Sequence, residues 1–351
     1  MKLAVSYHIA NGQPDRVHFV SRKQAHHGNT IGAMNITTKL GGSAPYGAAF
    51  NGLRVSHVSA AYPYRGLLQG ESEEQYAERL LQELEAEFRC VGTEKVAAFV
   101  AETIGGSTAG CLIPPPTYLE RVRRLCTRYG VLMILDEIMC GSGRTGTFFA
   151  FQAEGNVQPD IVTLGKGLAG GYLTLAAVLL RRHVHETIER GAGGLGRPTS
   201  QAGDVSCAAA LAVQRIVKGK GLLSSCAQLG EELGDMMRGA LQGLKFVGDV
   251  RGRGLFWAIE FVEDKGTKKP LRVEFGFAAR VRAVAHDNDV ALLSGGGTAD
   301  GVRGDHVLVA PPLQIGREEL LTLVEVIKAA YIKTEEAYIR ESLPKIRVTR
   351  V

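Results

Sequence analysis

The stretch VLMILDE, residues 131–137, places five apolar residues directly before two carboxylates, Asp136 and Glu137. A continuous apolar run of this length predicts a strand that is buried on both faces, with Asp136 at its carboxyl end. Ligands of open α/β sheets bind beyond the carboxyl ends of the strands. A carboxylate there is partly removed from water, so it needs a protonated or cationic partner. Taken alone, Asp136 would also suit a residue that caps the next turn.

A lysine follows a second apolar run. Lys166 follows residues 161–164 with one glycine between them, and glycines lie at 165, 167, 170 and 171. Small neighbours let a planar ligand approach the backbone, and a partly buried lysine is a better nucleophile toward carbonyls because its charged form is disfavoured. Alone, this pattern is typical of an ordinary glycine-rich turn. Together with Asp136 at a neighbouring strand end, it indicates a binding site.

Short apolar runs bounded by turn residues recur through the first two-thirds of the chain. They cover residues 17–20, 53–58, 97–101, 132–135, 161–164 and 176–180. Apolar residues at helical spacing separate several of them, as in 73–88 and 116–129. Strands that alternate with helices predict an α/β fold with a mainly parallel sheet flanked by helices.

The last third of the chain has fewer parallel-strand signals. Helices are predicted over 206–217, 224–241, 273–288 and 317–337, and strands over 255–262 and 307–309. This pattern predicts a smaller α+β domain. We therefore expect a large domain over residues 1–221, a small C-terminal domain over 222–337 and a basic tail over 338–351.

Composition and charge exclude several classes of protein. The 351 residues are 45% hydrophobic and 22% charged, with a net charge of +5 that is scattered along the chain, so we expect no nucleic-acid surface. The six cysteines form no C-x-x-C pair, which argues against a zinc site and against a disulfide scaffold. The sequence has no apolar run long enough to span a membrane, no secretory signal and no G-x-x-x-x-G-K-[ST] nucleotide-binding loop. A cytoplasmic protein is expected, or a mitochondrial one if a longer precursor exists.

Further short motifs accompany the two central residues. They are HGNT at 27–30, DEIMCG at 136–141, GRTG at 143–146, PD at 159–160, KGL at 166–168, RGRG at 251–254 and APPL at 310–313. In this order they resemble the signature of the class III aminotransferases, which are pyridoxal-phosphate enzymes of fold type I. The resemblance extends from about residue 1 to about residue 337.

The resemblance implies a role for each central residue. Lys166 would form the Schiff base with pyridoxal 5'-phosphate and then move a proton between the carbons of cofactor and substrate. Asp136 would keep the pyridine nitrogen protonated, so that the ring remains an electron sink. Ile138 would pack on one face of the ring. Glu102 corresponds to a glutamate at a strand end near the cofactor, although a capping role would also suit it.

The remaining expected cofactor contacts are His26, His27, Gly28 and Thr199. His26 stands where the family generally has Tyr or Phe stacked on the pyridine ring, and imidazole is a smaller ring that titrates near neutral pH. Thr199 matches a threonine that reaches the phosphate of the neighbouring subunit's cofactor. The resemblance therefore implies a homodimer with its active site at the subunit interface.

The chain also departs from the family pattern. Residues 1–4 resemble the helix that follows the phosphate-binding turn, and that turn does not precede them, so we expect weaker phosphate binding. Around Thr199, the aromatic and His-Pro positions of the family read Ser200 and Gly203-Asp204. Leu308 stands where the ornithine-type branch has a carboxylate-binding arginine, so no clamp for an α-carboxylate is expected there.

The function implied by the resemblance is amino-group transfer with pyridoxal phosphate. The donor would be an amino acid or amine, of ω-amino type, and the acceptor a 2-oxo acid or an aldehyde. Two alternatives stay open. One is a catalytically impaired paralogue that acts as a dimerisation or interaction protein. The other is a different pyridoxal-phosphate reaction on the same scaffold, such as that of a decarboxylase, racemase or aminomutase.

Overall fold

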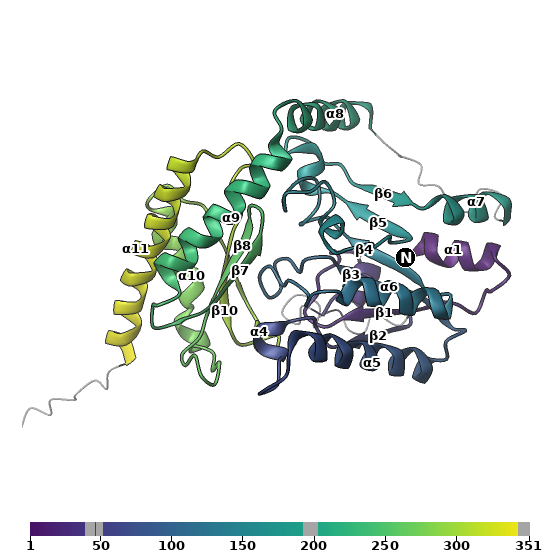
Figure 1. The fold of residues 1–351 in the computed structure, drawn as a ribbon, viewed down its shortest axis with the longest axis horizontal. Helices are drawn as coiled ribbons and strands as arrows, with labels where there is room; N and C mark the ends of the chain where they lie inside the picture. Colours follow the sequence, from purple (N-terminus) through teal and green to yellow (C-terminus); the bar gives the residue numbers. More distant parts are fainter. Residues whose placement is uncertain (39–45, 47–51, 192–202, 343–351) are drawn as a thin grey trace, which may run out of the picture.

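The computed structural model describes residues 1–38, 46, 52–191 and 203–342. These residues form two lobes, each built on its own sheet (Figure 1). The first sheet has six strands and the second has four. Within the described part of the chain, no helix is both long enough and apolar enough to cross a membrane.

The six-stranded sheet confirms the expected α/β architecture. Its order is β2-β1-β3-β4-β5-β6, with β6 antiparallel to β5 and the other pairs parallel. The strands are β1 (His18–Arg22), β2 (Val55–Val58), β3 (Val96–Glu102), β4 (Leu132–Asp136), β5 (Ile161–Leu164) and β6 (Ala177–Leu180). All six apolar runs are therefore strands, with shifts of up to two residues at their ends. β3 and β4 are buried along their whole length, which explains why they carry no polar alternation.

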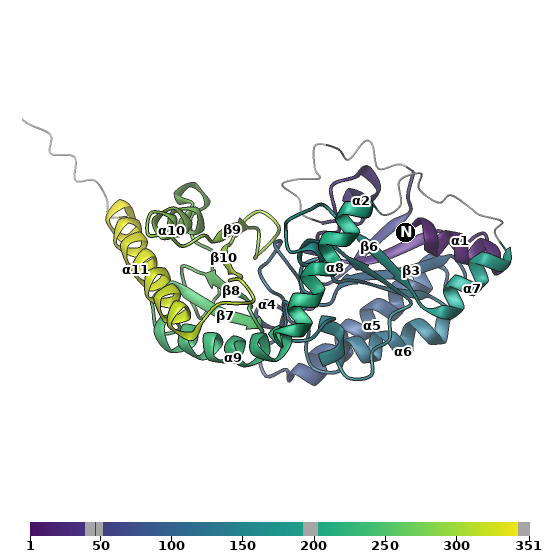
Figure 2. The ribbon, with the colours of Figure 1, turned by 90° about the horizontal axis from the view of Figure 1, so that it is seen from above.

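Helices cover both faces of this sheet, and successive residues of the central strands face opposite layers. Phe99 and Met133 pack with α5 (Glu73–Val91) and α6 (Tyr118–Tyr129). Val100 and Ile134, the next residues, pack with α1 (Lys2–Ala10) and α7 (Arg182–Gly191). Figure 2 shows α5 and α6 on one side of the strands and α1 on the other. Because helices cover the side chains on both faces of the sheet, the residues left to form a site are those at the carboxyl ends of the strands.

The sequence explains where α5 begins and ends. The Ser72 hydroxyl accepts a hydrogen bond from the Gln75 amide, and the Gln75 side chain accepts one from the Ser72 amide, so the two residues form a capping box. Glu73 and Glu74 in the first turn favour the positive end of the helix dipole. Gly92 ends the helix with φ +94°.

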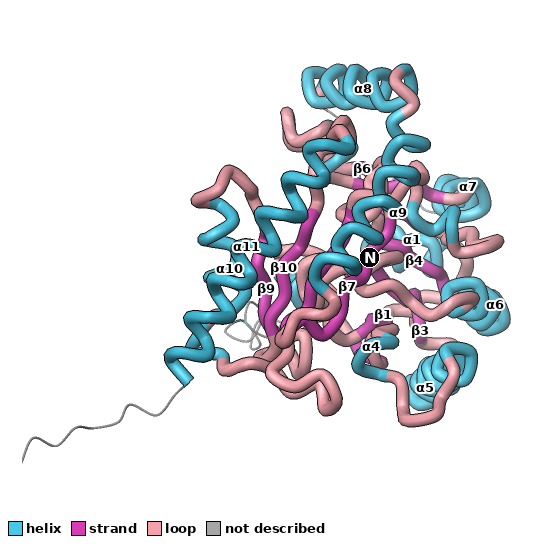
Figure 3. Tube along the Cα trace, turned by 60° about the vertical axis from the view of Figure 1, so that its left-hand side comes forward, coloured by secondary structure: helices cyan, strands magenta, loops and turns pink. Residues whose placement is uncertain are grey.

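The second sheet is antiparallel and has the order β7-β8-β10-β9. Its strands are β7 (Val247–Arg253), β8 (Phe256–Phe261), β9 (Leu293–Gly296) and β10 (Asp305–Val309). Its core is shared with helices α9 (Leu222–Leu241), α10 (Phe277–His286) and α11 (Arg317–Ser342), as Figure 3 shows from the side. α8 (Asp204–Gly219) precedes α9 in the chain and contacts both α9 and the 3-10 turn Lys166–Ala169 of the first lobe.

Two details of this lobe differ from the sequence predictions. The single helix predicted over 273–288 is wrong, because Gly276 adopts φ +63° and divides a 3-10 turn, Val273–Phe275, from α10. β9 was not predicted because its sequence, LSGG, has only one large apolar side chain. α11 runs on to Ser342, and Tyr338 near its end is buried against Phe275. The rest of the expected tail, 343–351, lies outside the described residues.

A buried charged network joins the two lobes. Glu260 of β8 accepts from Arg65 at 2.7 Å and from Arg251 of β7 at 2.8 Å. Arg65 follows β2, in the short helix α4 (Pro63–Gly66). Arg251 also donates to the Gly110 carbonyl of the first lobe at 2.6 Å. Because Glu260 is fully buried, both arginines are needed to offset its desolvation.

Candidate active site

Asp136 is the last residue of β4 and is buried at the carboxyl edge of the large sheet. Its Oδ1 accepts a hydrogen bond from the Ile138 amide at 3.0 Å, and its Oδ2 lies 2.9 Å from Nδ1 of His27. In the sheet register Asp136 is opposite Glu102 of β3 on one side and Thr163 of β5 on the other. The carboxylate is thus held from two sides and keeps unused lone pairs for a further donor.

His27 comes from the loop after β1 and crosses the end of β3 to reach Asp136. Its side chain is 3% exposed, and among the described residues its Nε2 has no hydrogen-bond partner. The local sequence HGNT explains this loop. Gly28 adopts φ +135°, where a Cβ would also lie 3.0 Å from the Cβ of Ala33, and Thr30 caps α2 (Ile31–Ile36) by accepting from the Ala33 amide.

Two further carboxylates lie beside Asp136. Glu102 ends β3, and its Oε1 accepts from the Gly106 amide at 3.0 Å. Burial raises the pKa of Glu102, with His27 opposing this shift and Asp136 adding to it. Glu137 accepts from the amides of Ala150 and Phe151 at 2.7 and 3.1 Å and from the Thr103 hydroxyl. Its place directly after Asp136 was the only sequence signal for this second buried acid.

Lys166 follows β5 and begins a 3-10 turn, Lys166–Ala169. Its backbone has φ +41°, a conformation that is strained for a residue with a side chain. The expectation of partial burial is wrong for the single chain, where Lys166 is exposed. Ile138 lies between this turn and Asp136, because a Cβ added at Gly165 would be 3.5 Å from Ile138 Cγ2.

The donors and acceptors at this edge fit a pyridine ring that carries a protonated nitrogen. Asp136 has free lone pairs for an N–H donor, and His27 holds it in place. Ile138 supplies an apolar surface for one ring face, while His26 lies half-buried in the preceding loop. The amine of Lys166, from the adjacent strand end, is available to a carbonyl. These are the groups that pyridoxal phosphate requires.

Comparison with known proteins decides the family. The model of the class III aminotransferase family matches residues 1–331. This chain belongs to the class III aminotransferases. Enzymes of this family depend on pyridoxal phosphate and transfer amino groups. The relatives and the structural neighbours of this chain are aminotransferases as well.

Sequence relatives and solved structures agree. An uncharacterized aminotransferase of Schizosaccharomyces pombe is 40% identical over 96% of this chain and 73% of its own length. Gamma aminobutyrate transaminase 2 of Solanum lycopersicum is 32% identical, with 96% and 71% covered. A pyridoxal-phosphate-bound amine transaminase from an uncultivated Pseudomonas species superposes with a TM-score of 0.85 at 30% identity, covering 95% of this chain and 73% of the other. The aminotransferase thus spans about three-quarters of the length of such relatives.

Some expected site residues lie elsewhere. Thr199 and Ser200 lie outside the described residues. Gly203 and Asp204, which follow them, form the start of α8, where Asp204 is exposed. Leu308 is buried in β10 against Phe256, so this position presents no charged group to a substrate.

The aminotransferase has a cavity of about 680 Å³ that Lys166 lines. The GRTG motif supports the family resemblance, and nothing in the local sequence indicates a role for its arginine. The structure places Arg144 in the wall of this cavity, and Ser142 beside it. Burial lowers the pKa of Arg144.

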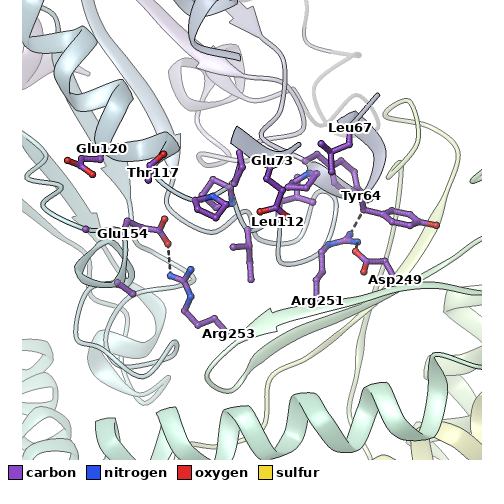
Figure 4. A pocket seen from close by; sticks show the side chains of 18 of the residues that line it. Tyr64, Leu67, Glu73, Leu112, Thr117, Glu120, Glu154, Asp249, Arg251 and Arg253 are labelled. Atoms are coloured by element: carbon purple, nitrogen blue, oxygen red, sulfur yellow. Dashed lines mark hydrogen bonds and ion pairs between the residues drawn. The ribbon is translucent and has the colours of Figure 1, made fainter. Parts of the chain in front are cut away.

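A second cavity, of about 780 Å³, lies at the junction of the lobes and does not include Lys166 (Figure 4). Its arginines already have acidic partners: Arg253 pairs with Glu154 at 2.6 Å and Arg251 with Asp249 at 2.7 Å. Its polar groups therefore serve to hold the junction together.

Proposed function

We propose that the aminotransferase moves an amino group from an ω-amino acid or amine to a 2-oxo acid or an aldehyde, with Lys166 and Asp136 as the residues that hold pyridoxal phosphate. One observation carries this proposal. Asp136 ends β4, Lys166 follows the adjacent parallel strand β5, and Ile138 lies between them. Substrate names among the relatives, such as gamma aminobutyrate transaminase and vanillin aminotransferase, support small amines and aldehydes as the class.

The roles of the protein groups follow from their positions. Bound pyridoxal phosphate supplies an electron sink and a carbonyl. Asp136 keeps a proton on the ring nitrogen, and His27 prevents the carboxylate from turning away. Lys166 Nζ takes up the proton that leaves the substrate carbon and returns it at the other carbon. Ile138 excludes water from one ring face.

Further assignments at this site belong to the same proposal. Glu102 is assigned to the cofactor's surroundings because it is the buried register neighbour of Asp136. His26 and Gly28 are assigned through their positions next to His27. Thr199 is assigned from the resemblance alone. We also propose that residues 1–221 and 222–337 are two domains, each with its own sheet.

A homodimer is proposed for the same chain. The exposed large apolar side chains include Tyr172 after the Lys166 turn, Leu179 on β6 and Leu211 on α8. Two of these segments are neighbours, since α8 contacts the Lys166 turn that precedes Tyr172. Apolar surface of this extent is typical of an interface. A cytoplasmic location, or a mitochondrial one for a longer precursor, agrees with six free cysteines.

The test is the absorption spectrum of the purified chain with added pyridoxal phosphate. We expect a Schiff-base band that Lys166→Ala abolishes and that Lys333→Ala, at an exposed lysine on α11, leaves unchanged. Adding 6-aminohexanoate or hexylamine together with pyruvate should then yield alanine and the corresponding aldehyde. A band without these products would indicate another pyridoxal-phosphate reaction. No band at saturating cofactor would refute the proposed role of Lys166 and favour the impaired paralogue.

A further inference from the structure

The cavity beside Lys166 combines apolar walls with an excess of positive charge. Its apolar side chains come from α8, β8 and the loop after β10, and include Val213, Ile216, Phe256 and Leu313. Its charged side chains are Lys166 and Arg144, and no aspartate or glutamate of the described residues lines it. Lys166 is exposed and Arg144 is half-buried, so a cavity that they line without any acid favours an anionic group of a ligand.

Arg144 is fixed in position and has no acidic partner. Its Nη1 donates to the carbonyls of Pro311 at 2.5 Å and Leu255 at 3.2 Å. No carboxylate in the described part of the chain lies within ion-pair distance of it. The arginines at the junction of the lobes differ in this respect, since Arg251 and Arg253 both pair with acids. The guanidinium of Arg144 is therefore held rigidly while its charge stays uncompensated.

Ser142 adds an unsatisfied donor to the same wall. The residue is 3% exposed and lines the cavity, yet its hydroxyl has no hydrogen-bond partner among the described residues. Its backbone has φ +56°, so the strained turn holds this side chain in place. Gly167 of the lysine turn is close by, because a Cβ there would lie 3.5 Å from the Cβ of Ser142. A buried hydroxyl without a partner suits an acceptor supplied by a ligand.

We propose that Arg144, assisted by Ser142, binds the carboxylate of the substrate and makes the aminotransferase selective for amino donors with an acid at the far end of an apolar chain. The inference rests on the proposed function, because it places the reacting amine at Lys166. A guanidinium with one nitrogen fixed still presents donors that match a carboxylate. Val213, Ile216 and Leu313 then cover the methylene groups between the two ends of the substrate.

The kinetic test compares 6-aminohexanoate with hexylamine, which share a chain and differ in the acid. In Arg144→Gln the KM for 6-aminohexanoate should rise about 10- to 100-fold, as expected for a lost charged hydrogen bond, while the KM for hexylamine changes less than about twofold. Arg89→Gln, at an exposed arginine on α5 away from this cavity and from the lobe junction, is the control and should alter neither KM. Equal losses for both donors, or no change for either, would overturn the assignment.

A binding test separates this inference from the proposed reaction. Hexanoate should bind the cofactor-free chain, measured by calorimetry, and Arg144→Gln should weaken this binding at least 10-fold while Arg144→Lys retains part of it. If Arg144→Gln does not fold, Ser142→Ala takes its place with an expected loss of several-fold for hexanoate and none for hexanol. If the wild-type chain binds hexanoate but transfers no amino group, the proposed function fails and the site stands. Hexanoate binding that survives both substitutions unchanged refutes the site.

Discussion

Glu137 is fully buried beside Asp136, and burial raises the pKa of its carboxyl from 4.5 to about 7. Its hydrogen bonds from Thr103, Ala150 and Phe151 lower this pKa without cancelling the effect of burial. Because the folded state holds the proton more tightly than the unfolded state, Glu137 stabilises the fold fully below about pH 4.5. This contribution is lost as the pH rises through about 7. A shift of about 2.5 units corresponds to about 3 kcal/mol.

The substitution Glu137→Gln removes this titration and nearly preserves the shape of the side chain. Urea unfolding of both proteins at intervals from pH 4.5 to 8 gives the difference in their free energies of unfolding. Relative to the variant, the wild type should lose about 3 kcal/mol across this range. Asp305, whose pKa burial raises to about 6, titrates in both proteins and cancels in the difference. A difference that stays constant with pH would refute the argument, because it would mean that Glu137 is ionised in the folded protein throughout.

Two further predictions concern the loop that carries His27. His27→Ala should raise the Kd for pyridoxal phosphate about 10- to 100-fold, since it removes a charged hydrogen bond to Asp136. The Kd is measured by absorbance titration. The control is His57→Ala, at a half-buried histidine of β2. An unchanged Kd would show that Asp136 needs no such support. Gly28→Ala should lower the free energy of unfolding by about 1–3 kcal/mol in thermal or urea melts, because φ +135° and the 3.0 Å approach to Ala33 both disfavour a Cβ. Gly12→Ala, with φ +73° and open space around it, isolates the contribution of the contact.

The large sheet was predictable because its strands bury both faces. Continuous apolar runs such as 97–101 and 132–135 have no polar alternation. They are also too short for typical helices, which favours buried strands. β9 gave no such signal, since two of its four residues are glycines. The break at Gly276 was hidden by helical spacing on either side of it. Local sequence patterns thus predict the helices and strands that bury apolar side chains. They miss features that depend on the backbone conformation of glycines, such as β9 and the break at Gly276.

The candidate site was predictable only in part, for a physical reason. Asp136 and Lys166 could be paired from the sequence because parallel strands bring their carboxyl ends to one edge. The contact of His27 with Asp136 spans 109 residues and depends on a loop crossing the end of β3, which no local pattern records. The missing acidic partner of Arg144 is likewise a property of three-dimensional packing.

In the proposed assignment, the residues that hold the cofactor and the residue that binds the substrate carboxylate are fixed by different parts of the molecule. Asp136, His27 and Lys166 all belong to the large sheet and its loops, so the proposed cofactor-binding groups come from one lobe. Arg144 stands in a loop of the same lobe, but its side chain is fixed by carbonyls of Leu255 and Pro311, which belong to the other lobe. Any shift of one lobe against the other would therefore move the proposed carboxylate-binding group relative to Lys166. Selectivity for the substrate should accordingly respond to changes at the lobe junction that leave cofactor binding unaffected.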